Sequence, residues 1–270
     1  MRRLTSLLLC LRALALCAGG DNTPVGPRIA GMGQAGVTLI DLWSVHHNQA
    51  GLAGLTKITV GAHYQRHFLS EELSQQGLAV AIPLGKGTIA VSGNSLGFDL
   101  YRETKAGVAY AMRFGEGLRA GVQLNYFNVR LGENYGSRSM MTAELGIQAR
   151  LTDKLWIGAH LYNPTRAELG GPYDEKVPTI LRVGLGYTFS EKLVITGEVA
   201  KDIDRQEQFH AGIEYRPINA LFLRTGVSTG PVQGHFGAGV RVKNFDIDLA
   251  VAYRSLLGPT PMIGLNYRFE

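Results

Sequence analysis

The sequence predicts an all-β fold: a transmembrane antiparallel up-and-down β-barrel of about 14 strands, with an N-terminal hatch segment inside the lumen. Three observations predict it. From Lys57 to Glu270, apolar residues alternate with polar residues or glycine, and a period of two is typical of strands with one apolar face. Short turns and longer links alternate along the chain. Aromatic residues gather near both ends of the strands, where a barrel crosses two membrane–water interfaces.

Composition excludes several other classes of protein. The 270 residues are 45% apolar and 18% charged, which is too apolar and too weakly charged for a disordered chain. No apolar run reaches the ~18 residues that a membrane-spanning helix needs. The 35 glycines are about twice the usual share of this residue. The composition therefore favours a sheet protein in which glycine has a structural use.

The first residues are typical of a secretory signal peptide. A cationic start is followed by an apolar stretch that ends near Ala18, and small residues come next, as a cleavage site requires. We assign residues 1–19 to this signal. Both cysteines, Cys10 and Cys17, lie in it. Its removal takes 3 of the 27 basic residues and leaves 24 against 22 acidic ones, so the mature chain offers little support for a nucleic-acid partner.

The alternating region, residues 56–270, contains about 14 segments, each near the ~9–11 residues of a tilted membrane strand. An even number of strands places both mature termini on one side, which we expect to be the periplasmic side of a Gram-negative outer membrane. A soluble all-β protein could also bury one face of its sheet without lipid, but it has no reason to sort its loops by length. The longer links are expected at Leu69–Gln75, Gly97–Tyr101, Gly132–Arg138, Pro164–Val177, Asp202–Arg205, Gly230–Gln233 and Ser255–Pro259.

Residues 20–55 lack strand alternation and form the predicted hatch. Three of their glycines match the G-x-G-x-x-G fingerprint of dinucleotide sites, but no strand precedes the match and no βαβ unit follows it. We therefore assign these glycines to close backbone packing or to positive φ angles. The residues that define the hatch motif are Arg28, Gly31, Gly33, Gly36, Asp41, Trp43, Asn48, Gln49 and Ala50.

The run from Arg28 to Leu55 resembles the N-terminal hatch of FadL-like outer-membrane barrels. The resemblance is closer to the Bacteroidota branch that contains the PorV-type and PorQ-type barrels of type IX secretion, and it extends to the small barrel that plugs the idle translocon of that system. It implies a plugged barrel and a place in protein secretion. The family usually has Asn-Pro-Ala where this chain has Asn48-Gln49-Ala50. Without the fixed φ of proline, a less rigid hatch turn is expected.

The inward face of the predicted barrel is polar and rich in glycine. We expect the inward glycines 184, 186, 212, 237 and 239 to leave room for the hatch backbone. The inward charged residues are interpreted as ion pairs that brace the hatch, because a plugged lumen is expected to be polar. They are Glu144, Arg150, Arg182, Glu198, Glu214, Arg216, Arg224 and Arg241.

The outward face of the third predicted strand continues as Gly93 and Ser95, which are too small and polar for lipid, and Asn94 lies between them in the candidate stretch. This patch predicts a bulge, a lateral opening or a protein contact, and the resemblance points the same way because FadL-like barrels have a side door in their third strand. Alternatively, these residues lie above the hydrocarbon band. His63 and His67 share a strand face without a third metal ligand in view. The chain has no motif of a serine hydrolase or a zinc protease, so no catalytic, cofactor or metal site is predicted.

Two functions remain open at this stage. The first is a plugged accessory or interaction subunit related to type IX protein secretion, with a translocon or attachment-complex protein as partner. The alternative is a FadL-like transporter of hydrophobic small molecules across the outer membrane. Both have outer-membrane lipid as a partner, and neither involves nucleic acid or catalysis. Short external loops and a polar inner face favour the first.

Overall fold

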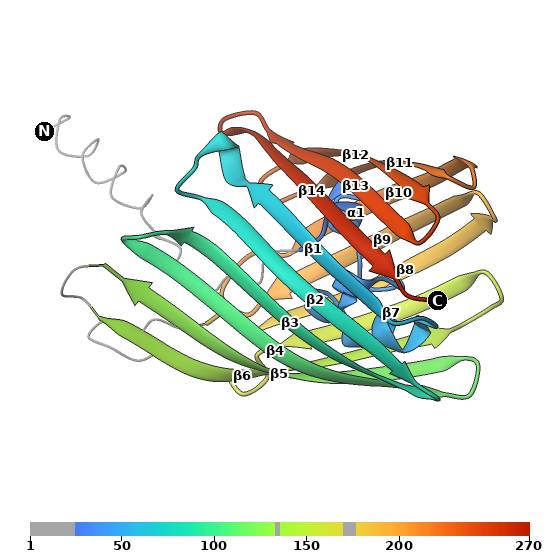
Figure 1. The fold of residues 1–270 in the computed structure, drawn as a ribbon, viewed down its shortest axis with the longest axis horizontal. Coiled ribbons are helices and arrows are strands. Elements are labelled where there is room, and N and C mark those ends of the chain that lie inside the picture. The colour runs from blue at the N-terminus through green and yellow to red at the C-terminus, as the bar shows by residue number, and fades with distance from the viewer. Residues whose placement is uncertain (1–24, 133–135, 170–176) are drawn as a thin grey trace, which may run out of the picture.

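The computed structural model describes residues 25–132, 136–169 and 177–270, and the predicted signal peptide lies outside them. Fourteen antiparallel strands form a closed barrel (Figure 1), which confirms the predicted fold class. Among the described residues, no helix has the length and hydropathy that are needed to cross a bilayer. The strands are β1 (Thr59–Arg66), β2 (Ser74–Leu84), β3 (Gly87–Phe98), β4 (Tyr101–Phe114), β5 (Leu118–Leu131), β6 (Ser137–Arg150), β7 (Leu155–Tyr162), β8 (Ile180–Ser190), β9 (Leu193–Asp202), β10 (Gln208–Ile218), β11 (Leu221–Ser228), β12 (Gln233–Val242), β13 (Phe245–Arg254) and β14 (Gly258–Arg268).

The barrel closes between its first and last strands. β1 pairs with β14 from Thr59 opposite Arg268 to Gln65 opposite Met262. Because β1 and β14 pair continuously over this stretch, the sheet is closed and has no unpaired edge strand. The start of β1 and the end of β14 therefore lie at the same end of the barrel (Figure 1).

The connections sort by end, as the sequence predicts. We call the end that carries the β2–β3, β4–β5, β6–β7, β8–β9, β10–β11 and β12–β13 turns the short-turn end, and the opposite end the long-loop end. Two predicted longer links are wrong. Between β13 and β14 the chain leaves only residues 255–257 outside the strands, fewer than residues 151–154 of the β6–β7 turn. Between Gly97 and Tyr101 the chain leaves only residues 99 and 100 outside the strands, because the ladder continues to the pair Phe98–Tyr101. Backbone pairing needs no apolar side chains, so it extends β3 and β4 beyond their alternating part.

The outer face of the barrel is an apolar belt. Leu78, Val108 and Leu124 point outward from β2, β4 and β5 and keep 64%, 60% and 62% of their surface exposed. A continuous apolar surface of this kind marks a membrane or protein interface. Its position around the middle of the strands is the arrangement expected of a barrel in lipid.

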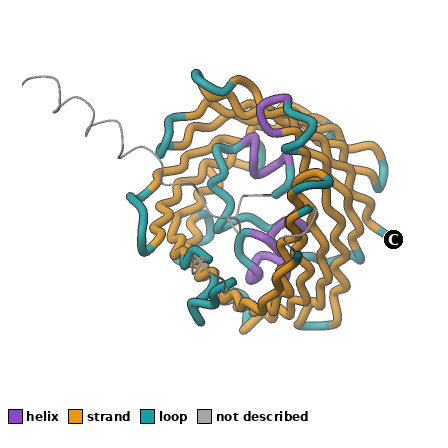
Figure 2. The backbone as a smooth tube through the Cα atoms, turned by 90° about the vertical axis from the view of Figure 1, so that its left-hand side faces the viewer, coloured by secondary structure: helices purple, strands orange, loops and turns teal. Residues whose placement is uncertain are grey.

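The N-terminal segment lies inside the barrel, as predicted (Figure 2). We call residues 25–55 the hatch. It contains the helix α1 (Pro27–Gly31) and two 3₁₀ helices, η2 (Leu42–His46) and η3 (Gln49–Gly54), while η4 (His67–Leu69) belongs to the β1–β2 link. Ile29, Val45 and Leu52 are completely buried. The hatch therefore supplies the apolar core that the polar barrel wall lacks.

One side of the barrel wall is built from small apolar side chains. Five inward alanines of β2, β3 and β4 are buried in the same cluster as the hatch residues Leu42, Trp43 and Leu52. Because a strand presents every second residue to the lumen, alanine at these positions leaves the volume that the large hatch side chains fill. The alanines are Ala79, Ala81, Ala90, Ala109 and Ala111.

Most of the inward glycines contact the hatch, as predicted. A Cβ built at Gly31 would lie 3.1 Å from the Cα of Gly237, and one built at Gly212 would lie 2.7 Å from the carbonyl carbon of Met32. Cβ atoms at positions 184 and 186 would meet the side chains of Val37 and Thr38. The prediction for position 239 is wrong, because that glycine faces the side chains of Asp248 and Arg224 and leaves room for an ion pair instead.

The substitution Gly212→Val tests this packing. The new side chain would overlap the Met32 backbone, and overpacking of this kind costs about 1–3 kcal/mol. We expect a lower temperature for the loss of the compact, fast-migrating form in a gel of unboiled samples. Gly197→Val is the matched control, since a Cβ there meets nothing within 4 Å. Equal transition temperatures for the two variants would show that the hatch does not pack against Gly212.

Candidate functional site

The candidate site is the hatch together with the wall residues that hold it, because it obstructs the lumen. Local sequence shapes each part of it. Pro27 stands in the first turn of α1, where its fixed φ suits a helix and its missing N–H is not needed. Asp41 accepts a hydrogen bond from the N–H of Trp43 and begins η2. Asn48 accepts one from the N–H of Ala50 and begins η3. Two motif residues are therefore helix caps.

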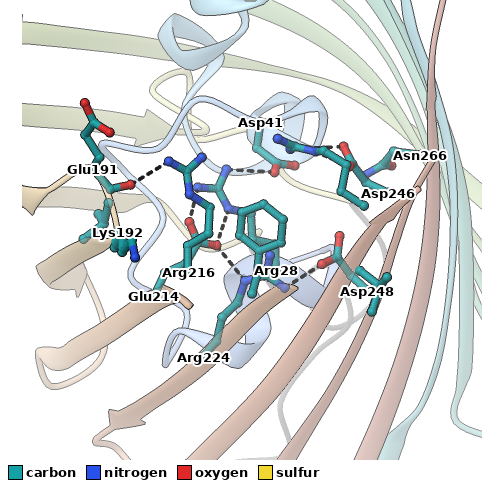
Figure 3. Close-up of a pocket in the computed structure, with 14 residues that line it drawn as sticks. Arg28, Asp41, Glu191, Lys192, Glu214, Arg216, Arg224, Asp246, Asp248 and Asn266 are labelled. Carbon is teal, nitrogen blue, oxygen red and sulfur yellow. Dashed lines mark hydrogen bonds and ion pairs between the residues drawn. The ribbon is translucent and has the colours of Figure 1, made fainter. Parts of the chain in front are cut away.

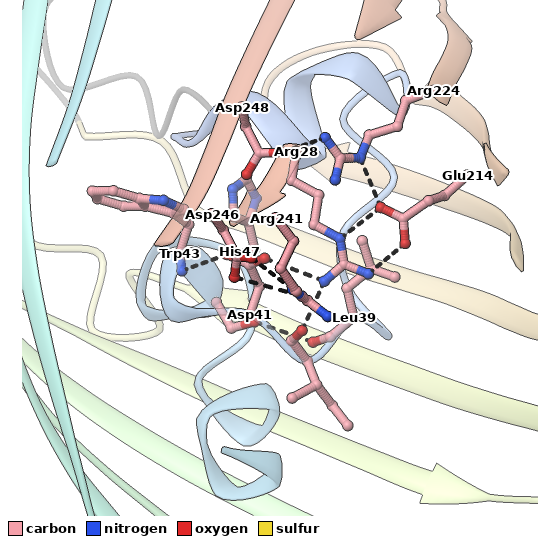
Figure 4. Close-up of polar contacts among 12 residues, drawn as sticks. Arg28, Leu39, Asp41, Trp43, His47, Glu214, Arg224, Arg241, Asp246 and Asp248 are labelled. Carbon is pink, nitrogen blue, oxygen red and sulfur yellow. Dashed lines mark hydrogen bonds and ion pairs between the residues drawn. The ribbon is translucent and has the colours of Figure 1, made fainter. Parts of the chain in front are cut away.

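Arg28 connects the hatch to the barrel at the short-turn end (Figure 4). Its Nε and Nη2 donate to the two carboxylate oxygens of Glu214 on β10 at 2.9 and 2.8 Å. Its Nη1 donates to the carbonyl of Ile40 at 2.8 Å and to Asp41 Oδ2 at 3.2 Å. A bidentate arginine–carboxylate pair is among the strong charge-assisted hydrogen bonds of proteins. Arg28 thus fixes both α1 and the segment that leads into η2.

A second arginine extends this contact across the wall. Arg224 on β11 donates from Nε to Glu214 Oε2 at 2.7 Å and from Nη1 to Asp248 Oδ1 on β13 at 2.5 Å. We call Arg28, Asp41, Glu214, Arg224 and Asp248 the mouth cluster. The Arg224 side chain is only 3% exposed. Removing one charge from such a buried set leaves an uncompensated charge, which is strongly destabilising.

A different polar cluster holds η3 in the middle of the lumen. Glu144 on β6 is completely buried and accepts hydrogen bonds from Gln49 Nε2 at 2.7 Å and Lys105 Nζ at 2.6 Å. Asn125 Nδ2 donates to it at 2.9 Å, and His160 Nε2 lies 2.9 Å from its second oxygen. We call these five residues the central cluster. The Gln49 side chain donates a hydrogen bond to Glu144, which a proline at this position could not do. This hydrogen bond holds the hatch turn to the wall, and the expectation of a less rigid turn did not include it.

Neighbouring hatch groups are satisfied by the wall in the same way. Asn48 Nδ2 donates to the carbonyls of Val37 at 2.7 Å and Ile147 at 3.0 Å. Glu198 on β9 accepts from the N–H of Val37 at 2.9 Å, and Arg182 stands 3.6 Å from its other oxygen. Backbone and side-chain polar groups that leave water need such partners. The wall therefore provides hydrogen-bond partners for polar groups of Asn48 and Val37 in the hatch.

The structure separates the predicted lumen residues into two sets. Glu144, Glu198 and Glu214 contact the hatch directly, and Arg182 stands behind Glu198. Arg150 and Arg241 do not contact it. Arg150 pairs with Glu116 in the β4–β5 turn at 3.3 Å, and Arg241 pairs with its strand neighbour Asp246 at 2.7 Å. Both brace the short-turn end of the barrel.

The predicted opening in the third strand is not a break in the sheet. Gly93, Asn94 and Ser95 on β3 pair with Leu78, Gly77 and Gln76 on β2, and with three consecutive residues of β4. A glycine in a strand removes a side chain without disturbing the ladder. The patch is therefore a shallow place on an intact wall, and a protein contact at this patch stays a prediction.

The remaining motif glycines and the histidines serve packing. Gly33 has a φ of +65°, and a Cβ there would meet the backbone of Val227, while one at Gly36 would meet Ile29. His63 packs edge-on against Trp43, with ring centroids 4.8 Å apart.

Sequence reasoning missed Lys105, Asn125 and His160 as partners of Glu144. All three occupy inward positions of β4, β5 and β7, so reading the inward residues of neighbouring strands together could have found them.

Polar cavities lie on both sides of the hatch. At the short-turn end, a cavity of about 260 Å³ is lined by the mouth cluster and by Lys192, Arg216 and Arg241 (Figure 3). At the long-loop end, a cavity of about 190 Å³ is lined by the hatch residue Gln34 and by Arg182 and His210. Hatch residues thus line both cavities. Movement of the hatch is what would connect the two ends.

Burial affects the ionisable groups of the hatch. Burial and the nearby Arg182 lower the pKa of His47 to about 3, so this ring is neutral at ordinary pH. Its Nε2 lies 2.7 Å from the carbonyl oxygen and 3.2 Å from the N–H of Val25. For Arg28, burial alone would lower the pKa, but the Glu214 and Asp41 carboxylates raise it above its usual value. Arg28 therefore stays charged.

Comparison with known proteins relates the whole barrel to solved structures. No model of a known protein family matches the chain, and no curated protein resembles it in sequence. The structure is similar to the CymD monoaromatic hydrocarbon channel, with a TM-score of 0.73 and 14% identity over 93% of this chain and 99% of that one. It is also similar to the toluene transporter TodX of P. putida, with a TM-score of 0.72 and 12% identity over 93% and 100%.

A FadL homologue of Pseudomonas aeruginosa is a further structural relative, with a TM-score of 0.60 and 11% identity over 91% of this chain and 98% of that one. These identities are low, so the comparisons establish a shared fold. The fold is that of hydrocarbon channels and of a FadL homologue over nearly the whole chain.

The mouth cluster generates a stability prediction. Glu214→Gln keeps the size of the side chain but leaves the buried Arg224 and the partly buried Arg28 without their shared carboxylate, and breaking a buried pair costs about 3–5 kcal/mol. We expect a corresponding loss in the free energy of unfolding by denaturant in detergent. Asp246→Asn is the matched control, because its arginine partners are 30% to 37% exposed and exposed pairs contribute about 0–1 kcal/mol. Equal losses of unfolding free energy in Glu214→Gln and Asp246→Asn would contradict a stabilising role for the mouth cluster.

His47 generates a pH prediction. The pKa of His47 is about 3 in the folded protein against about 6.5 for a histidine in an unfolded chain, so the unfolded chain binds a proton at higher pH than the folded chain. Its contribution is fully present above pH 6.5 and is lost as the pH falls toward about 3. We expect His47→Gln to flatten the decline of unfolding free energy across this window. An unchanged decline in the variant would show that His47 is not buried as described.

Proposed function

We propose that this protein is an outer-membrane channel for small hydrophobic molecules and that the hatch is its gate. The observation that carries the proposal is a barrel with the fold of monoaromatic hydrocarbon channels over 93% of the chain, together with a lumen that this chain closes with its own N-terminal segment. The outer apolar belt supports a membrane location. The short turns support a periplasmic short-turn end, and both ends of the barrel sequence lie there.

The lumen contains an apolar region at its long-loop end. Phe127, Met140 and Tyr162 point inward from β5, β6 and β7 and are buried with Leu169 and Val177 of the β7–β8 link. A small hydrophobic molecule that enters from this end would meet these side chains before it meets the central cluster. Lys105 lies between the two regions, with its Nζ 4.8 Å from the centre of the Tyr162 ring. The apolar region is therefore the first place where such a molecule could leave water.

Passage requires the hatch to move, because it separates the two cavities. It is attached by packing against the wall alanines and by hydrogen bonds and ion pairs of its side chains, while the strands around it are joined by backbone pairing along their length. Contacts of this kind can be released without unfolding the barrel. We therefore assign the gate to the hatch.

A role as an accessory subunit of type IX secretion was the preferred function at the level of sequence. The hatch motif and the filled lumen agree with either function, and the similarity of the whole barrel to hydrocarbon channels favours the transporter. None of the contacts described above requires a secretion partner. Transport of small hydrophobic molecules is therefore the better-supported proposal.

The experiment is uptake of radiolabelled toluene by cells of a Gram-negative strain that lacks related channels, with and without this protein. We expect uptake several-fold faster with the protein, while uptake of a sugar of similar size is unchanged, because the apolar region gives a sugar no binding site. Equal toluene uptake in both strains would contradict the proposal. Purification of the protein as a stoichiometric complex with a secretion component would favour the accessory role instead.

A further inference from the structure

Lysine is distributed very unevenly over the barrel. Of the seven lysines that the structure describes, five are exposed at the short-turn end, in the segment before β1 and in the β2–β3, β6–β7, β8–β9 and β12–β13 turns. The other two are Lys105 in the lumen and Lys201 at the long-loop end. We call the five the lysine rim: Lys57, Lys86, Lys154, Lys192 and Lys243.

The rim lysines have no acidic partner among the described residues, since the structure shows no carboxylate of these residues within 4 Å of them. At the long-loop end, by contrast, Lys201 lies 3.9 Å from Glu207, and Arg102 lies 3.4 Å from Asp99. Of the acidic side chains at the short-turn end, Glu116 and Asp153 are approached by Arg150, and Asp246 pairs with two arginines. Glu191 and Glu270 are exposed there as well. The five rim lysines outnumber these two carboxylates, so the rim has an excess of positive charge.

An aromatic girdle lies next to the rim on the outer face. Phe114, Tyr187, Phe189, Tyr215 and Phe245 point outward near the short turns, and each keeps 39% to 60% of its surface exposed. Such girdles mark the level of a membrane–water interface. The rim lysines lie in the connections beyond this girdle, at the level of lipid headgroups, and Lys192 also lines the cavity at the short-turn end. Flexible lysine stems can follow the apolar surface while their ammonium groups remain in the headgroup layer.

We propose that the lysine rim binds the phosphate groups of anionic phospholipids in the leaflet that faces the short-turn end. Lysine is a flexible point charge, and basic residues beside a membrane attract anionic lipids. The five lysines come from connections spread around the barrel, and this distribution fits a ring of lipids better than one protein partner on one patch. The proposal rests on the membrane location in the proposed function, and it is independent of what the channel carries.

The test measures which lipids the full-length barrel retains. The protein is reconstituted in nanodiscs of phosphatidylcholine and phosphatidylglycerol, and the lipids that it retains are identified by native mass spectrometry. One favourable lysine contact corresponds to an enrichment on the order of fivefold. We expect enrichment of phosphatidylglycerol that declines at high salt and falls to the bulk ratio when all five rim lysines are changed to glutamine.

Two further variants complete the test. Changing the five rim lysines to arginine keeps the charge and should keep the enrichment, which controls for damage to the turns. Changing Arg66, Arg102, Arg130, Arg138 and Lys201 to glutamine removes the same number of charges at the long-loop end and should leave the enrichment unchanged.

The proposal is overturned if the wild-type barrel retains the bulk lipid ratio, or if the glutamine variant of the rim keeps its enrichment. It is also overturned if the long-loop variant loses as much enrichment as the rim variant. Toluene uptake by the same variants separates the two proposals, since a loss of lipid enrichment with normal uptake removes only the lipid site.

Discussion

The partly buried pair between Arg28 and Glu214 is the interaction on which the closed state of this barrel depends. Arg28 donates from Nε and Nη2 to the two carboxylate oxygens of Glu214, and Nη1 of the same side chain holds the Ile40 carbonyl. Glu214 and the Arg224 behind it are buried, and buried charges need their partners in place. The hatch position and the mouth cluster are therefore one structural unit.

The same constraint explains the composition of the wall. Where the hatch backbone comes close, the inward positions are glycine, and where its large apolar side chains pack, they are alanine. Where its polar groups face the wall, glutamate, asparagine and lysine meet them, as in the central cluster. The inner face of the barrel is thus complementary to the hatch. If the hatch is the gate, these contacts must break when it opens and form again when it closes.

Much of this fold could be predicted from the sequence, because strand alternation and turn length report directly on which face is buried and where strands end. The caps made by Asp41 and Asn48 and the glycines beneath the hatch follow from the same local rules. Partners far apart in sequence could not be predicted. Glu214 meets Arg28 across 186 residues, and such a pair depends on how the barrel closes and how deep the hatch lies. The contact of Gln49 with Glu144 depends on the same information.

The central claim is that the hatch closes the lumen and must move for transport. A disulfide between Gly31→Cys and Gly237→Cys tests it most directly, because a Cβ at Gly31 lies 3.1 Å from Gly237 Cα, and the two native cysteines lie in the predicted signal peptide. We predict that toluene uptake by the oxidised variant falls to the level of cells without the protein and recovers on reduction, while each single cysteine variant, which carries the added side chain without the cross-link, shows the same uptake in the oxidised and reduced states. Equal uptake by the double variant in the oxidised and reduced states, with the disulfide formed, would contradict the account.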